Sequence, residues 1–200
     1  MKLYDMELSG NCYKVRLLCS LLNIDYDRVP VDLMQGQHKT EDFLRLNPRG
    51  QIPILEDTGA LIWDSSAILV YLARQYGGEQ WLPLAPKPIA AVMQWLSLAQ
   101  NELLYGLARA RAAKKFNRPW DIEQCRQHGR QGLQVLERQL ATNVWLAGSQ
   151  LTIADIACYP YVALAPEGGV ALAEFPAVLA WMQRIRELPG YVAMPGIGAD

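Results

Sequence analysis

Residues 47–55 read NPRGQIPIL, and this stretch decides how the first part of the chain folds. Asn-Pro and Arg-Gly are turn signals, and the apolar residues that follow them are typical of a strand. Pro53 has no N–H to donate to a neighbouring strand, so it belongs at a sheet edge or at a special turn. The stretch therefore predicts a turn that leads into a strand, with a proline at the junction.

Short strands and helices alternate on both sides of this stretch, from residue 2 to about residue 77. Strands are expected at residues 2–6, 26–33, 51–57 and 60–64, and helices at residues 11–23 and 65–77. The segment 36–48 is expected to be loop-like, around one helix. This order predicts a right-handed βαβ unit with a parallel strand pair, extended by an antiparallel hairpin.

The second half of the chain reads as helical throughout. A Pro- and Gly-rich segment at 77–88 predicts a linker, and helical apolar spacing follows at 89–107, 121–140, 151–165 and 175–188. Met93 is expected on the inward face of the first of these helices. The segment 151–165 is apolar on nearly all sides, so it is expected at the centre of the helical half. These patterns predict domains at 1–77 and 88–200, joined by a linker at 78–87.

Composition argues against several classes of function. The chain has 200 residues and a formal net charge of -1, so no long-range field favours nucleic acid or an anionic membrane. No apolar run is long enough to span a bilayer, and the start of the chain lacks the features of a signal peptide, which predicts a cytoplasmic protein. Four cysteines without a C-x-x-C motif and two distant histidines predict free thiols and no metal site.

Residues 8–19, LSGNCYKVRLLC, carry two reactive groups where a strand turns into a helix. Ser9 has a hydroxyl just before the predicted helix, and Cys12 has a thiol in its first turn. The positive end of the helix dipole favours an anion at this point, including a cysteine thiolate. A buried Cys12 that packs as a small apolar residue is the alternative. The residues themselves leave the choice between the two groups open.

A folding signal precedes the central helix of the second half. Thr152 and Asp155 have the spacing of a capping box, in which each side chain accepts a hydrogen bond from the backbone of the first helical turn. The pair predicts a helix start and no catalytic role.

Three segments resemble motifs of the glutathione S-transferase family. Residues 47–55 are similar to its N-P-x-G-x-[VI]-P-x-L segment, residues 64–73 (DSSAILVYLA) to its [EQD]-S-x-A-I-x-x-Y-L segment, and residues 148–157 (GSQLTIADIA) to its G-x-x-x-[TS]-x-A-D helix start. The resemblance covers almost the whole chain. It implies an α/β thioredoxin-like N-terminal domain followed by an all-α helical bundle domain. It also implies a cytoplasmic homodimer that serves detoxification, with glutathione as substrate and no metal.

The resemblance further implies a binding site for glutathione, which is a short extended peptide. The Ile52-Pro53 bond is expected to be cis, which leaves the N–H and C=O of Ile52 free to pair with the peptide as an added strand. At the start of the next helix, Ser65 is expected to hold the γ-glutamyl carboxylate, and Asp64 the ammonium. Both residues also suit a capping role alone. The implied glutathione-binding residues are His38, Lys39, Gln51, Ile52, Pro53, Asp64 and Ser65.

Resemblance to the serine-type transferases favours Ser9 as the group that stabilises the glutathione thiolate. Residues 9–15, SGNCYKV, fit their motif, with Gly10 in a place often held by proline. Cys12 is the rival, because relatives of the beta and omega types use a cysteine in this region. The candidate catalytic residues are Ser9, Asn11 and Cys12.

A second-substrate site is implied between the two halves, lined by the first helices of the helical half. A small and largely hydrophobic electrophile is expected there. The basic run at 109–115 is expected to be a solvated face that could also draw an anionic electrophile. The candidates for this site are Leu104, Tyr105, Ala108, Arg109, Arg111, Phe116 and Trp120.

Three functions follow as hypotheses. The favoured one is a glutathione transferase, which lowers the thiol pKa and holds the two reactants together. The second is a glutathione-dependent thiol-disulfide reductase or isomerase that uses Cys12 or binds glutathione disulfide. The third is a binding protein that keeps the fold without catalysis.

Overall fold

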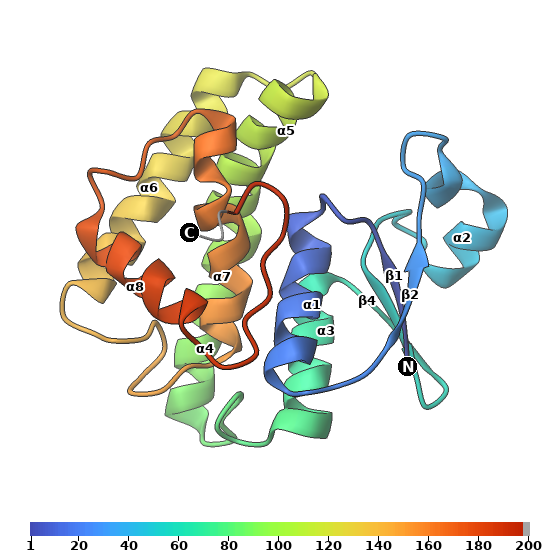
Figure 1. The fold of residues 1–200 in the computed structure, drawn as a ribbon, viewed down its shortest axis with the longest axis horizontal. Helices are drawn as coiled ribbons and strands as arrows, with labels where there is room; N and C mark the ends of the chain where they lie inside the picture. The colour runs from blue at the N-terminus through green and yellow to red at the C-terminus, as the bar shows by residue number, and fades with distance from the viewer. Residues whose placement is uncertain (198–200) are drawn as a thin grey trace.

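In the computed structural model, which describes residues 1–197, a mixed sheet occupies one side of the molecule and helices fill the other (Figure 1). The strands are β1 (Lys2–Asp5), β2 (Asp27–Pro30), β3 (Ile54–Asp57) and β4 (Ala60–Trp63). They lie in the order β2-β1-β3-β4, with β1 parallel to β2 and β3 antiparallel to both of its neighbours. The predicted βαβ unit and hairpin are therefore confirmed, in a thioredoxin-like arrangement.

Two helices separate this sheet from the rest of the molecule. Figure 1 shows α1 and α3 between the strands and the helical half. The helical elements of the first half are α1 (Gly10–Leu21), a 3₁₀ turn (Gln37–Lys39), α2 (Glu41–Leu46), α3 (Ser65–Leu72) and a π-helical stretch (Ala73–Gly77).

The loop-like region before β3 is more ordered than its composition suggests. Thr40 caps α2, since its side chain accepts a hydrogen bond from the N–H of Phe43 at 3.4 Å. Phe43 is buried and packs with Val31 and Ile54 in a small second core. This cluster attaches α2 to the sheet and holds the 3₁₀ turn in place beside it.

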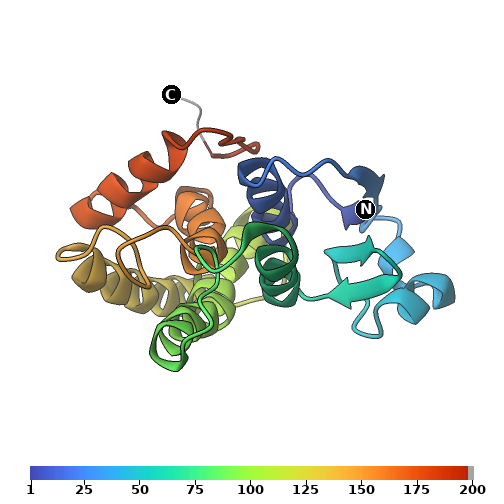
Figure 2. The same ribbon diagram turned by 90° about the horizontal axis from the view of Figure 1, so that it is seen from below.

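The second half of the chain is helical, as predicted. Its elements are α4 (Pro86–Leu98), a π-helical stretch (Ala99–Ala108), α5 (Arg109–Phe116), α6 (Ile122–Leu140), α7 (Ile153–Ala163), a 3₁₀ turn (Ala165–Gly168) and α8 (Pro176–Arg186). Every residue of α7 is buried, and Figure 2 shows this helix enclosed by the others. The prediction that Met93 lies on the inward face of α4 is wrong. Its side chain is 51% exposed, because Val92 and Leu96 occupy the inward face.

The predicted capping box of α7 is confirmed and extends further than the sequence indicates. One oxygen of Asp155 accepts the N–H of Thr152 at 3.1 Å. The other accepts the N–H of Leu146 at 3.0 Å and the indole N–H of Trp181 at 2.9 Å. Asp155 has no exposed surface, and burial raises its pKa to about 6. The carboxylate therefore joins the start of α7 to α8 through Trp181, and to the segment that precedes α7 through Leu146.

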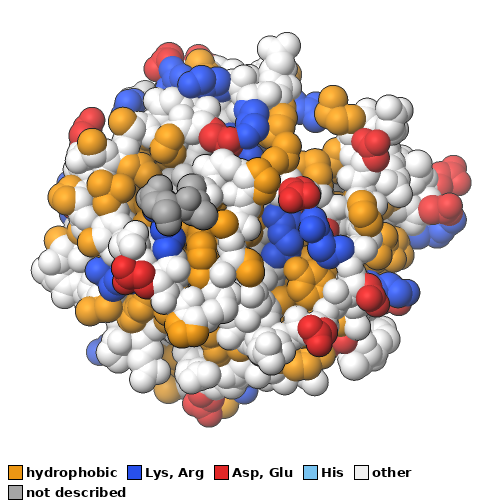
Figure 3. All heavy atoms as spheres, in the orientation of Figure 1, with side chains coloured by type: hydrophobic (Ala, Val, Ile, Leu, Met, Phe, Trp, Pro, Cys, Tyr) orange, Lys and Arg blue, Asp and Glu red, His pale blue; other side chains and the backbone are white. Residues whose placement is uncertain are grey.

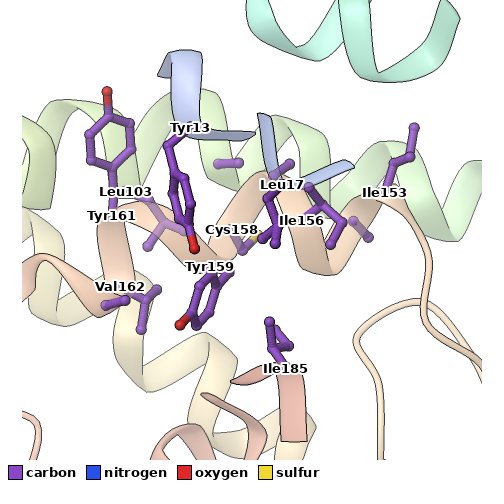
Figure 4. Packing of buried hydrophobic residues seen from close by; sticks show 14 of the residues in the cluster. Tyr13, Leu17, Leu103, Ile153, Ile156, Cys158, Tyr159, Tyr161, Val162 and Ile185 are labelled. Carbon is purple, nitrogen blue, oxygen red and sulfur yellow. The ribbon is translucent and has the colours of Figure 1, made fainter. Parts of the chain in front are cut away.

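The two halves share one continuous hydrophobic core. It runs from Leu3 in the sheet to Trp181 in α8. At its centre, Tyr13 of α1 and Tyr159 of α7 lie with ring centroids 6.4 Å apart (Figure 4). The Tyr159 and Trp181 rings meet edge to face at 6.0 Å. Relative motion of the halves would therefore disrupt aromatic packing.

The chain after α8 runs along α1. The Tyr13 hydroxyl donates to the carbonyl of Val192 at 2.6 Å, and the Ser20 hydroxyl donates to the carbonyl of Gly190 at 2.7 Å. The hydroxyls of Tyr159 and Tyr191 lie 2.9 Å apart. The segment 192–195 lines a hollow with Arg16 and Arg28, away from the cleft described next.

Candidate active site

A cleft with a volume of about 670 Å³ lies between the two halves of the molecule. Figure 3 shows the surface hollowed at its upper edge, between the helical half and the segment around α2. Most of the predicted site residues line it: Ser9, Asn11, His38, Lys39, Gln51, Ile52, Asp64, Leu104, Tyr105, Ala108, Arg109 and Trp120. Five predicted residues are absent from its lining: Cys12, Pro53, Ser65, Arg111 and Phe116.

Ser9 stands at the start of α1, on the floor of the cleft. It is the N-cap, with an extended backbone, and its hydroxyl oxygen accepts the N–H of Cys12 at 3.3 Å. The hydroxyl proton can rotate toward a group in the cleft. Ser9 thus combines a donor with the positive end of a helix dipole, which together favour an anion.

Cys12 lies in the first turn of α1 but is absent from the lining of the cleft. It has no exposed surface, and burial raises the pKa of its thiol to about 12, with a further contribution from the negative charge of Asp5. A thiol that stays protonated at neutral pH is a poor nucleophile. The geometry therefore favours Ser9 over Cys12, which packs as a small apolar residue.

Asp64 joins the two halves at the other side of the cleft. It is the N-cap of α3, accepts the N–H of Ser66 at 2.9 Å, and has a φ of 79°, an uncommon value for a residue other than glycine. Arg49 donates to its carboxylate at 3.2 Å, and Gln100 donates at 3.0 Å from the helical half. Arg49 belongs to the turn before Pro53, but nothing in the sequence pairs it with Asp64.

Ser65 lies behind the cleft lining. It is 2% exposed, and its hydroxyl donates to the side-chain oxygen of Asn11 at 3.3 Å. This hydrogen bond ties the start of α3 to the start of α1. Ser65 therefore orients Asn11, which does line the cleft.

The turn before β3 presents an unpaired backbone to the cleft. The Ile52-Pro53 bond is cis, as the resemblance implied, and Pro53 itself is buried. Asn47, which is 1% exposed, donates from its side chain to the carbonyl of Gln51 at 2.7 Å and so fixes the turn. Within residues 1–197, the N–H and C=O of Ile52 have no backbone partner.

His38 and Lys39 lie on the 3₁₀ turn against this same segment. The Lys39 ammonium donates to the carbonyl of Gly50 at 3.1 Å. Gly50 has a φ of 57°, and a side chain there would meet the carbonyl of His38 at 2.7 Å. Burial lowers the pKa of His38, and the positive charges of Lys39 and Arg118 lower it further.

Tyr161 belongs to the segment expected at the centre of the helical half, and its ring borders both the core and the cleft. It is 7% exposed, and a Cβ added at Gly10 would lie 2.6 Å from its ring. In Figure 4 its hydroxyl points away from Tyr159. Gly10 is therefore needed for close packing, where a proline would collide with the ring.

Lys14 is a further residue whose buried position the sequence does not indicate. It has no exposed surface, and its ammonium has no hydrogen-bond partner among residues 1–197. The ammonium lies 5.2 Å from the centre of the Tyr161 ring, at a distance typical of a cation–π contact. Burial lowers the pKa of Lys14 to about 8.

Replacing Lys14 with methionine is expected to stabilise the protein by about 2 kcal/mol at pH 7. The methionine side chain has a similar volume but no buried, unpaired charge. The folded protein releases the Lys14 proton more readily than the unfolded chain, so the cost is full below pH 8 and disappears as the pH rises toward the unfolded pKa. The advantage of the variant should therefore shrink by about 1 kcal/mol between pH 7 and pH 9. Urea unfolding of both proteins at each pH measures it, and an equal or larger advantage at pH 9 would contradict this account.

Aromatic and basic side chains form the helical side of the cleft. The Arg109 guanidinium lies 4.1 Å from the centre of the Tyr105 ring and 5.2 Å from that of Trp120. Leu104 and Ala108 line the cleft beside them. The loop after α5 adds Arg118, whose place in the cleft the sequence does not indicate.

Arg111 and Phe116 do not line the cleft, which corrects their place in the predicted second-substrate site. The solvated face expected at 109–115 holds for the exposed Lys114 and Lys115 but not for Arg111. Arg111 is 4% exposed, pairs with Glu167, and donates to the carbonyl of Leu8 at 2.8 Å. Its guanidinium lies 5.4 Å from the centre of the Phe116 ring. Arg111 thus attaches α5 to the turn that carries Ser9, which the basic composition of the run does not reveal.

Within residues 1–197, no group of three His, Cys, Asp or Glu side chains is arranged to hold a metal ion. In the same part of the chain, no helix has the length and apolar character needed to cross a membrane.

Comparison with known proteins gives consistent matches along the chain. Residues 3–80 match the family model "Glutathione S-transferase, N-terminal domain", and residues 102–189 match "Glutathione S-transferase, C-terminal domain". Glutathione S-transferase 1 of Manduca sexta is 32% identical, over 100% of this chain and 94% of its own length. Disulfide-bond oxidoreductase YfcG of Escherichia coli (strain K12) is 31% identical, over 90% of this chain and 87% of its own length.

A solved structure matches the whole architecture. The crystal structure of a glutathione S-transferase from Pseudomonas fluorescens [Pf-5] superposes with a TM-score of 0.91 and is 38% identical. The match covers 97% of this chain and 98% of that one.

Proposed function

This chain belongs to the glutathione S-transferase family, and we propose that it conjugates the glutathione thiolate to a small, largely hydrophobic electrophile. The observation that carries the proposal is the cleft that contains Ser9 at the start of α1, the carboxylate of Asp64 and the unpaired backbone of Ile52. A hydroxyl, a carboxylate and a strand-like edge are complementary to the thiol, the ammonium and the peptide backbone of glutathione.

In this proposal, each end of glutathione has its own partner. The backbone of Ile52 pairs with the middle of the peptide, and Asp64 takes the ammonium. The free N–H groups at the start of α3, including that of Ser65, hold the γ-glutamyl carboxylate. His38 or Lys39 takes the glycyl carboxylate.

The chemical step depends on the thiolate. A free thiol has a pKa near 8.5, so little thiolate exists at neutral pH. The Ser9 hydroxyl and the α1 dipole would lower that pKa by stabilising the anion. The sulfur then forms a bond to the electrophilic carbon, while a leaving group departs with its electron pair.

Glutathione-dependent disulfide reduction is the second candidate, because a relative is named a disulfide-bond oxidoreductase. The buried Cys12 argues against a protein thiol in this reaction. The remaining route uses two glutathione molecules. The first thiolate opens the disulfide, the second attacks the mixed disulfide, and glutathione disulfide is released.

A homodimer is also proposed, with the first half of one copy against the first long helices of the other. Leu61 and Trp63 on β4 and Met93 on α4 are exposed large apolar side chains of the kind that such an interface buries. A cytoplasmic location and a role in detoxification remain predictions from the family resemblance, as do the domain limits at 1–77 and 88–200.

The direct test measures two activities of the unmodified chain with glutathione. One assay follows conjugation to a chloronitrobenzene, and the other follows reduction of a small disulfide. The thiolate absorbance of bound glutathione is recorded at several pH values. Conjugation together with a bound thiol pKa below that of free glutathione is expected. Disulfide reduction without conjugation would favour the second candidate.

Replacing Asp64 with asparagine is expected to raise the Kd of glutathione about 30-fold, because the ammonium loses a charged acceptor of nearly the same shape. The KM for glutathione should rise more than kcat falls, since the contact acts equally before and during the reaction. Titration calorimetry and steady-state kinetics measure both effects. Asp27→Asn, an exposed aspartate on β2, is the matched control and should leave Kd unchanged. An unchanged Kd in Asp64→Asn would contradict the assigned role.

A further inference from the structure

The cleft contains more positive than negative side chains. Among its lining residues, Lys39, Arg49, Arg109 and Arg118 are basic, whereas Asp64 is acidic. The chain as a whole has a formal net charge of -1, so this excess is local. A cleft with one sign of charge concentrates ligands of the opposite sign.

The two basic residues of the first half already have partners. Arg49 pairs with Asp64, and the Lys39 ammonium donates to the carbonyl of Gly50. Both also lie where the proposed function puts glutathione, whose two carboxylates would use the positive charge on this side. The excess that remains is on the helical side of the cleft.

Arg109 is held there without an acidic partner. Among residues 1–197, no carboxylate lies within ion-pair distance of its guanidinium, which instead contacts the rings of Tyr105 and Trp120. Stacking on aromatic rings orients a guanidinium and leaves its edge free to donate two parallel hydrogen bonds. That edge is complementary to a carboxylate.

Arg118 supplies a second positive charge on the same wall. It follows Asn117, whose φ of 50° ends α5 and turns the chain back over the cleft. Arg118 is exposed and has no ion-pair partner within the described residues. Its charge lowers the pKa of His38 on the opposite side, so its field reaches across the cleft.

From this arrangement we infer that the electrophile carries a carboxylate, which Arg109 and Arg118 bind while its apolar part packs against Leu104, Tyr105 and Trp120. The inference rests on the proposed transferase function. An anionic electrophile and a thiolate repel each other in water, and the two guanidinium groups on this wall of the cleft offset that repulsion. The reacting sulfur bonds to carbon and the leaving group departs, with the carboxylate unchanged.

A matched pair of electrophiles tests the inference. 4-Chloro-3-nitrobenzoate and 4-chloro-3-nitrobenzamide share the same reacting carbon and release chloride, but only the first is anionic. Each kcat/KM is divided by the uncatalysed rate constant for the same compound, which removes their intrinsic difference in reactivity. The unmodified protein is expected to favour the benzoate by about tenfold, and the preference should fall with added salt.

Variants identify the residues responsible. Arg118→Gln alters an exposed side chain and should not affect folding, and Arg109→Gln removes the stacked guanidinium. Each should lower kcat/KM for the benzoate several-fold and together about tenfold, and the ratio of benzoate to benzamide kcat/KM should fall by a similar factor. Arg130→Gln, an exposed arginine of α6 outside the cleft, is the control and should change neither. Equal preference for the two electrophiles, or equal losses for both in the variants, would overturn the inference.

Binding without turnover separates this inference from the proposed function. The two glutathione conjugates, one with the carboxylate and one with the carboxamide, are titrated into the protein. Tighter binding of the carboxylate conjugate, lost in the double variant, supports the anion site even if neither electrophile is transferred. Absence of turnover with both compounds would then count against the transferase proposal alone. Equal affinity for the two conjugates would overturn the anion site.

Discussion

Replacing Ser9 with alanine is expected to lower kcat/KM for conjugation about 100-fold, an effect comparable to the loss of one donor from an oxyanion-binding site. The Ser9 oxygen already accepts the N–H of Cys12, and its hydroxyl proton is free to turn to an anion in the cleft. The substitution removes that donor and leaves the α1 dipole in place. The thiol of bound glutathione should consequently titrate at a higher pH, as measured by thiolate absorbance.

Three companion variants make this result specific. Ser9→Thr keeps the hydroxyl and should retain most of the activity. Cys12→Ala removes a thiol that has no exposed surface and should leave the pKa of bound glutathione unchanged. Ser9→Ala also removes a helix cap worth about 1 kcal/mol, so unfolding is measured alongside activity. If Cys12→Ala removes a reactive protein thiolate while Ser9→Ala has no effect, the opening turn serves redox chemistry instead.

The Asp155→Ala variant is expected to lose about 4 kcal/mol of folding stability. The N–H groups of Leu146 and Thr152 and the indole N–H of Trp181 all donate to this carboxylate, and all three bonds are buried or largely buried. Without the carboxylate, these donors are left without an acceptor. Each unsatisfied buried donor costs about 1–3 kcal/mol of stability, and relaxation of the surrounding structure offsets part of the sum. Urea unfolding measures the difference, with little change in kcat expected because Asp155 is absent from the cleft lining.

The pH dependence of the stability difference distinguishes the loss of this carboxylate from general destabilisation. Burial raises the pKa of Asp155 to about 6, so the folded protein holds this proton more tightly than the unfolded chain does. The contribution of Asp155 to stability therefore increases as the pH falls from 7 toward the unfolded pKa. The difference between the unmodified protein and Asp155→Ala should grow by about 1 kcal/mol between pH 7 and pH 5. A difference independent of pH would contradict the buried carboxylate as its cause.

Control variants divide the effect among the hydrogen bonds. Thr152→Ala removes only the cap of α7, which accepts the N–H of Ala154 at 3.2 Å, and should cost about 1 kcal/mol. Asp155→Asn keeps one acceptor oxygen and should fall between the two. If Thr152→Ala costs as much as Asp155→Ala, the link from α7 to Trp181 contributes nothing of its own.

Local signals determined much of the fold without the structure. Alternation of apolar residues predicts the strands, and short-range chemistry predicts the cap of α7 and the turn before Pro53. These features depend on residues a few positions apart, which is why they can be read from one sequence. The resemblance adds the cis bond before Pro53 and the division into an α/β half and a helical half.

Burial distinguishes Ser9 from Cys12, a choice that the sequence leaves open. Ser9 and Cys12 both lie at the start of α1, and their neighbours in the chain do not reveal which one faces the cleft. The answer depends on packing from residues far away in the chain: the Tyr161 ring lies against Gly10, and Cys12 has no exposed surface. Burial away from solvent keeps a thiol protonated and unreactive, so tertiary structure sets its chemistry.

The sequence also does not show which charged side chains pair with one another. Arg109 and Arg111 are two residues apart in one basic run, yet Arg109 lines the cleft and Arg111 is buried against Glu167. Likewise, Asp64 meets Gln100 only because the two halves pack together. The sequence alone therefore determined the elements, their order and the stretches that carry the chemistry. Tertiary structure decided which side chains of those stretches share the cleft, because burial and pairing depend on residues that are distant in the chain.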